Sequence, residues 1–360
     1  MTTSERLPLW SWACPALAAI VLLLSFAFDK GSAIAALAAV ALFGAVFAAV
    51  YHAEAIAHRV GEPFGTLVLA LAVTLIETAL IVSVMIAAPA QNAGLARDTV
   101  FAAVMIVCNG IVGACLLAGG VRHREQVFQI EGASSALVVL VALTGLTLVL
   151  PNYTTSVLGP LFSAPQLVFA AIVSLLLYVS FIFVQTIRHR DYFLPVQAAS
   201  PEQHASVPSA ATAWLCAGLL LVALVVIVGL AKLLTPTVES AVARLGVPDA
   251  VVGIVIAALV LLPEGLAAVR AALGNRLQTS LNLALGSALA TIGLTIPAVT
   301  SVSLARHQPL ELGLDAKDQA LLLLTLLLAA MTLSTGRTTV LHGIVHLLIF
   351  AVFLFFAVVP

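Results

Sequence analysis

The chain consists of long apolar blocks separated by short polar segments, and this pattern limits it to very few folds. Hydrophobic residues make up 62% of the 360 residues and charged residues only 9%, whereas soluble domains carry about 25% charged residues. Each block has roughly the 20 residues that a helix needs to cross about 30 Å of hydrocarbon. The stretch 321–330 is nearly solid Leu and Ala, without the alternation of a barrel strand. We therefore expect an all-α polytopic membrane protein.

The polar breaks divide the chain into about eleven candidate transmembrane helices. An odd number of spans places the two termini on opposite sides of the membrane. The predicted spans are 10–28, 32–51, 64–89, 99–120, 133–151, 165–187, 212–233, 248–273, 279–304, 319–335 and 338–359.

The distribution of Lys and Arg over the connections predicts the orientation. Nine of the 15 fall on the N-terminal side and six on the other, so the positive-inside rule places the N-terminus in the cytoplasm and the C-terminus on the outer side. The long polar segment 188–211 is then a cytoplasmic linker with the Pro, Ser, Gln and Ala mixture of a mobile segment.

Two segments at corresponding places in the two halves share a pattern. Residues 54–63 and 239–248 have Glu, Arg, Gly and Pro at identical offsets, and each precedes a long apolar span. This indicates a duplication, with an extra N-terminal helix (1–30), a first five-helix repeat (31–187), the linker (188–211) and a second five-helix repeat (212–360). Because five is odd, the second repeat is inverted, an arrangement that places a transporter's site near the bilayer midplane.

One glutamate lies deep inside the second span of each repeat. Of the 16 acidic residues, only Glu77 and Glu264 lie well inside predicted spans. A charge at the bilayer centre costs about 2.5–3.5 kcal/mol, so these carboxyls need protons, a bound cation or a partner. Alternation between protons and a metal cation is the chemistry of an antiporter, and carboxylate oxygens suit hard cations. The structural alternative is two protonated glutamates that hydrogen-bond helices together.

Further polar groups lie in the neighbouring spans. Asn109 is a buried amide that needs partners, and Ser287 and Thr291 are spaced one turn apart, although such threonines equally bond their own backbone. Pro263 precedes Glu264 and either breaks its helix or merely kinks it. His342 and His346 have a spacing that can bind metal, but no carboxylate or HExxH pattern accompanies them, so we expect no metal site there and no cofactor.

These residues carry a family resemblance. The glutamate in the second helix of each half, the segment 109–128 and the pair Gly286-Ser287 resemble the proton-exchanging branch of the calcium/cation antiporter superfamily, especially bacterial ChaA-type calcium or sodium/potassium:proton antiporters. The resemblance implies that Glu77 and Glu264 bind the ion, that Asn109 and Ser287 are supporting ligands, and that the protein lies in a bacterial inner membrane.

The sequence departs from this family at the residues just before each glutamate. The usual Gly-Asn-Ala-x-Glu signature reads Val-Thr-Leu-Ile-Glu at 73–77 and Val-Leu-Leu-Pro-Glu at 260–264, which leaves only the Thr74 hydroxyl as a polar substitute. Fewer neutral oxygens weaken the argument for Ca²⁺ and leave room for Na⁺ or K⁺.

We therefore expect a secondary active cation:proton antiporter that works by alternating access. A cation channel that uses the same carboxylates for selectivity is the alternative, although channels usually obtain such groups through oligomeric symmetry. No HExxH, GxSxG or clustered Cys and His is present, so we do not expect an enzyme. The expected partners are Ca²⁺, Na⁺ or K⁺, protons and the lipid bilayer; the balanced charge gives no sign of nucleic acid, and a homo-oligomer is left open.

Overall fold

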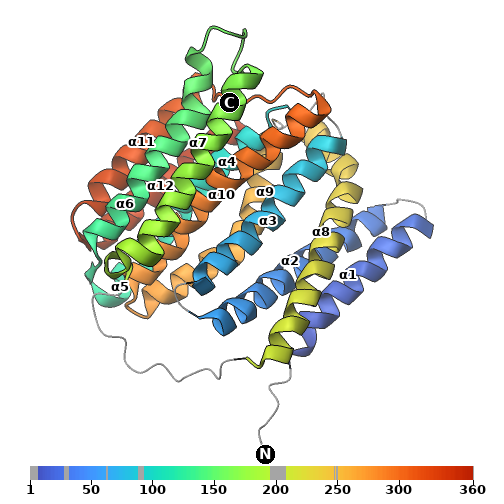
Figure 1. The fold of residues 1–360 in the computed structure, drawn as a ribbon, viewed down its shortest axis with the longest axis horizontal. Helices are drawn as coiled ribbons and strands as arrows, with labels where there is room; N and C mark the ends of the chain where they lie inside the picture. The colour runs from blue at the N-terminus through green and yellow to red at the C-terminus, as the bar shows by residue number, and fades with distance from the viewer. Residues whose placement is uncertain are drawn as a thin grey trace, which may run out of the picture. The chain divides into compact units, whose positions relative to one another are not determined.

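A computed structural model describes most of the chain, and the described residues are almost entirely helical (Figure 1). Contacts between Cα atoms divide the chain into two compact units, each built from helices that are distant in the sequence. The described residues are 7–27, 32–61, 64–87, 93–194, 208–246, 248 and 250–359.

The first unit contains the N-terminal helices and one helix from the second half of the chain. α8 runs alongside α2 and also contacts α1 and α3 (yellow beside blue in Figure 1). His52 of α2 bonds through Nε2 to the carbonyl of Ser11 in α1 at 2.8 Å, and the Ser83 hydroxyl of α3 donates to the carbonyl of Val228 in α8. The helices are α1 (Leu9–Ala27), α2 (Ser32–Val60), α3 (Phe64–Ala87) and α8 (Ala210–Leu245).

The second unit contains the remaining helices, with α10 and the run from α4 to α5 mostly buried within it. α10 packs against α6, α7 and α9, while α5 packs against α12. The elements are α4 (Leu95–Met105), η1 (Ile106–Ile111), α5 (Val112–His123), β1 (Gln126–Val127), α6 (Ile130–Thr144), η2 (Gly145–Val149), η3 (Leu150–Tyr153), α7 (Ala164–Phe183), η4 (Val184–Arg188), η5 (Arg190–Phe193), α9 (Ala250–Leu273), α10 (Leu277–Arg306), α11 (Ala316–Leu333), β2 (Arg337–Thr338) and α12 (Val340–Val358). The two short strands pair antiparallel, with Gln126 opposite Thr338.

Each predicted span corresponds to a long helix or to a continuous run of helical segments. Among the described residues, ten of these are long and apolar enough to cross a membrane, and α3 contributes a shorter apolar stretch, Leu71–Ile86. The all-α polytopic fold predicted from the sequence is confirmed.

The repeated segments have the same local structure in both halves. Residues 54–60 and 239–245, which we expected to lie between spans, form the last turns of α2 and α8. Both helices end at a glycine in the left-handed region, Gly61 with φ 77° and Gly246 with φ 63°. Glycine adopts this conformation without strain, and it is the usual way to end a helix. In the sequence a proline follows each glycine by two residues, and proline is unfavourable inside a helix.

Three helices of the first half contain π-helical segments, η1, η2 and η4. A π-turn is uncommon within an α-helix and is frequent at functional sites. None of these three segments was predicted from the sequence.

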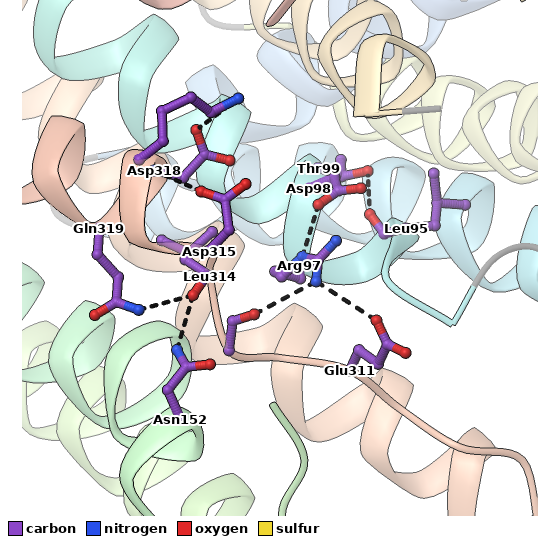
Figure 2. Close-up of polar contacts among 12 residues, drawn as sticks. Leu95, Arg97, Asp98, Thr99, Asn152, Glu311, Leu314, Asp315, Asp318 and Gln319 are labelled. Atoms are coloured by element: carbon purple, nitrogen blue, oxygen red, sulfur yellow. Dashed lines mark hydrogen bonds and ion pairs between the residues drawn. The ribbon is translucent and has the colours of Figure 1, made fainter. Parts of the chain in front are cut away.

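The connection between α10 and α11 is tied to the start of α4 by Arg97 (Figure 2). Arg97 Nε lies 2.7 Å from Asp98 Oδ1, while Nη1 lies 3.5 Å from Glu311 Oε2 and donates to the carbonyl of Gly313. The guanidinium group therefore joins the first turn of α4 to the connection between α10 and α11.

The same connection is also held by amide groups. The carbonyl of Leu314 accepts hydrogen bonds from Asn152 Nδ2 at 2.9 Å and Gln319 Nε2 at 2.8 Å. Asp315 caps α11 by accepting from the backbone N–H of Asp318, as Figure 2 shows. This end of the second unit is therefore cross-linked by side chains rather than by packing alone.

Arg97→Gln is expected to lower the free energy of unfolding by about 1–3 kcal/mol, because Asp98, with a side chain only 15% exposed, loses its charged partner. The matched control is Arg337→Gln, whose ion pair with Glu125 joins side chains that are 70% and 49% exposed and should contribute about 0–1 kcal/mol. Thermal unfolding in detergent measures both. Equal losses in the two variants would contradict a special role for Arg97.

Candidate functional site

Glu264 lies inside α9 and is 8% exposed. α9 and α10 are joined by a short turn at Asn275, which has a left-handed φ of 57°, so the two helices run back along each other. This pairing brings Ser287 of α10 to Glu264, and the Ser287 hydroxyl donates a hydrogen bond to Glu264 Oε2. The structure thus brings two of the predicted site residues together.

Pro263, directly before Glu264, does not break the helix. α9 is continuous from Ala250 to Leu273, so the alternative of a broken helix is wrong. Proline has no N–H to donate, and the carbonyl of Leu259, one turn earlier, therefore lacks its usual helical donor.

Thr291 follows Ser287 by one turn on α10 and is 1% exposed. Residues four apart lie on the same face of a helix, so the two hydroxyls belong to one buried polar face. Thr295 continues this face and is fully buried.

Glu77 and Thr74 lie one turn apart on α3, in the first unit. Both are buried, with exposed fractions of 1% and 3%. Each compact unit thus contributes one buried glutamate from a spanning helix. The joint role of Glu77 and Glu264 stays a prediction.

Asn109 lies in η1 and is fully buried. Its Nδ2 donates to Thr325 Oγ1 of α11 at 2.8 Å, and its Oδ1 lies 3.0 Å from His346 Nδ1 of α12. The expectation that this amide has partners is confirmed, but those partners lie on α11 and α12 and could not be assigned from the sequence.

The two histidines of α12 have separate roles. His342 Nδ1 accepts from the backbone N–H of Thr339 and caps the helix, whereas His346 is buried and bonded at both ring nitrogens, to Asn109 and to Thr332. In the described part of the chain, no group of three or more His, Cys, Asp or Glu side chains could hold a metal ion.

Comparison with known proteins identifies the family. The sequence profile described as sodium/calcium exchanger protein matches residues 30–187 and 215–359, which is most of the chain. The chain belongs to the sodium/calcium exchanger family. Membership confirms the resemblance to the calcium/cation antiporter superfamily, and the apolar helices make this family member a multi-pass membrane protein.

Two curated relatives and one solved structure match nearly the whole length of this sodium/calcium exchanger family member. The Sinorhizobium fredii protein y4hA is 50% identical over 361 residues, with 99% of this chain and 98% of the relative covered. The sodium-potassium/proton antiporter ChaA of Escherichia coli is 34% identical over 346 residues, with 94% and 93% covered. The structure of YfkE has a similar fold, with a TM-score of 0.72 at 17% identity and 98% and 99% of the two chains covered.

Sequence reasoning missed Tyr178 in this exchanger-family protein. Tyr178 of α7 is buried, and Gly293 of α10 makes room for it, since a Cβ at Gly293 would lie 2.5 Å from Tyr178 Cβ. Its hydroxyl has no hydrogen-bond partner among the described residues. The available signal was a phenolic hydroxyl within a mostly apolar span, which ordinarily requires a partner.

Proposed function

We propose that this protein is a secondary active cation:proton antiporter that works by alternating access. The observation that carries the proposal is Glu264, a carboxyl buried in a membrane-spanning helix with the Ser287 hydroxyl bonded to it. The relative ChaA, which is 34% identical over nearly the whole chain, is a sodium-potassium/proton antiporter and supports the same activity.

The proposed chemistry is competition between protons and a cation at Glu77 and Glu264. A buried carboxylate is costly unless its charge is neutralised, and either a proton or a metal cation does this. Because one carboxyl cannot hold both well, release of one favours uptake of the other. Thr74, Ser287 and Thr291 are the proposed supporting ligands, because their neutral oxygens suit hard cations, and Asn109 is a proposed supporting residue of the site.

The finer assignments are also proposals. We assign Na⁺, K⁺ or Ca²⁺ as the transported cation, the bacterial inner membrane as the location, and the cytoplasm as the side of the N-terminus. Two inverted five-helix repeats are supported by the two stretches that match one family profile and by the equivalent helix ends at Gly61 and Gly246. We also propose that transport involves no enzymatic step and no cofactor.

Everted vesicles with a pH-sensitive dye test this function. Addition of Na⁺, K⁺ and Ca²⁺ in turn, at several pH values, is expected to release protons from energised vesicles for at least one cation, with a fixed ratio of protons to cations. Vesicles without the protein are the control. Cation flux without coupled proton movement would instead indicate a channel, and no response to any of the three cations would contradict the proposal.

A further inference from the structure

The π-helical segment η1 lies between two pairs of helices in the second unit. It contacts α9 and α10, which carry Glu264 and Ser287, and also α11 and α12. Towards α9, the Ile111 side chain reaches Gly265, where an added Cβ would lie 3.2 Å from it. Gly265 directly follows Glu264, so the position of η1 and the position of this carboxyl are mechanically linked.

Asn109 points away from that contact. It precedes Ile111 by two residues, and two residues advance a helix by about half a turn, so the two side chains leave η1 on nearly opposite sides. The hydrogen bonds agree with this, because both partners of the Asn109 amide are on α11 and α12.

The Asn109 amide belongs to a continuous buried chain of hydrogen bonds. Asn109 Nδ2 donates to Thr325 Oγ1 at 2.8 Å, and the Thr325 hydroxyl lies 3.3 Å from Met105 Sδ. On the other side, Asn109 Oδ1 lies 3.0 Å from His346 Nδ1, and His346 Nε2 lies 3.1 Å from Thr332 Oγ1. Every one of these polar side chains is at most 5% exposed.

The directions of these hydrogen bonds follow from the donors and acceptors. Since the amide nitrogen of Asn109 donates to Thr325, its oxygen accepts, and the hydrogen of the imidazole lies on Nδ1. His346 Nε2 then pairs with the Thr332 hydroxyl. Both the nitrogen and the oxygen of the Asn109 amide are thus hydrogen-bonded to residues of α11 and α12.

Close backbone packing fixes the imidazole in place. A Cβ at Gly113 of α5 would lie 3.0 Å from His346 Cβ, and a Cβ at Gly343 of α12 would lie 2.4 Å from the backbone nitrogen of Leu117. α12 therefore lies directly against α5, and His346 cannot withdraw from η1 without separating the two helices.

We propose that Thr332, His346, Asn109 and Thr325 form a positioning network that holds the π-turn of η1 and, through the Ile111–Gly265 contact, sets the position of Glu264. This assigns a role in transport to His346, and it makes Asn109 a residue that acts through η1 rather than as a direct ligand. The proposal rests on the proposed antiport function, because exchange is what the network would adjust.

Two substitutions of His346 separate the two ends of the ring. The asparagine amide reaches the place of Nδ1, so His346→Asn keeps the bond to Asn109; the longer glutamine amide reaches the place of Nε2, so His346→Gln keeps only the bond to Thr332. In the vesicle assay we expect His346→Asn to retain the apparent KM for the cation. His346→Gln should raise it about three- to tenfold, the effect of one lost buried hydrogen bond.

Thr325→Val provides a second test with little risk to folding, because valine has the shape of threonine without the hydroxyl. It removes the acceptor of Asn109 Nδ2 and should raise the apparent KM by a similar factor. Asn109→Ala combined with His346→Gln should be no worse than Asn109→Ala alone, since residues in one network are not additive. Immunoblots of the membranes and monodispersity in detergent show that the variants fold.

The outcomes distinguish the network from its alternatives. Equal KM changes in His346→Asn and His346→Gln would overturn the proposal, because a proton acceptor or a space-filling ring is lost equally in both. If His346→Asn does not fold, Thr325→Val with an unchanged KM overturns the proposal by itself. If vesicles with the wild-type protein show no exchange, both the antiport function and the role of this network are overturned. If the wild-type protein exchanges cations but the two His346 variants have the same apparent KM, only the role of the network is overturned.

Discussion

Replacement of Glu264 or Glu77 by glutamine is expected to reduce cation-driven proton movement in everted vesicles to the level of vesicles without the protein. Glutamine keeps the shape of the side chain but can neither take up a proton reversibly nor present a negative charge to a cation. Both glutamates are buried, at 8% and 1% exposure, so surrounding water cannot substitute for the carboxylate. The loss should appear with every cation that the wild-type protein exchanges.

The control for this experiment is Glu131→Gln, the same chemical change at an exposed residue in the first turn of α6. It should exchange at the wild-type rate, which separates the buried carboxyls from a general effect of charge. All three variants should reach the membrane in equal amounts. Normal exchange in either Glu77→Gln or Glu264→Gln would exclude that residue from the mechanism.

Gly343→Ala should strongly lower the stability of the second unit. The added Cβ would lie 2.4 Å from the Leu117 backbone nitrogen and 2.9 Å from the carbonyl oxygen of Gly113. Backbone atoms cannot rotate aside as a side chain can, so α12 must move away from α5. We expect a loss of about 3 kcal/mol, measured by thermal unfolding of the purified protein in detergent.

Gly218→Ala is the matched control, because this glycine lies inside α8 with nothing within 4 Å of an added Cβ. It should leave Tm unchanged or raise it, since alanine favours a helix by about 0.5–1 kcal/mol over glycine. A comparable loss in both variants would show that the contact between α5 and α12 is not the cause.

Much of the fold was predictable because membrane helices are apolar along their whole length. The helix ends were less accurate, since the last turns of α2 and α8 carry Glu and Arg and resemble a polar loop. Gly61 and Gly246 marked the true ends, and the repeat pattern contained both. The π-segments could not be predicted, because they depend on partners that lie elsewhere in the chain.

The candidate site was predictable where a residue is energetically unfavourable in the membrane, as a carboxyl inside an apolar span is. Glu77 and Glu264 were evident as carboxyls inside apolar spans, and the short turn between α9 and α10 makes the Glu264–Ser287 contact local. Asn109 was identified, but its partners Thr325 and His346 are more than 200 residues away in the chain. Spacing within one helix cannot reveal such a contact, and for the same reason Tyr178 was overlooked.

The composition of the two units has a consequence for biosynthesis. α1, α2 and α3 leave the ribosome long before α8, the helix against which they pack, so the first unit cannot be completed until residue 245 has been inserted. A chain cut between Leu194 and Pro208 would give two fragments, neither of which contains a complete unit. Such fragments should be degraded when they are made singly and should complement each other when they are made together in one cell.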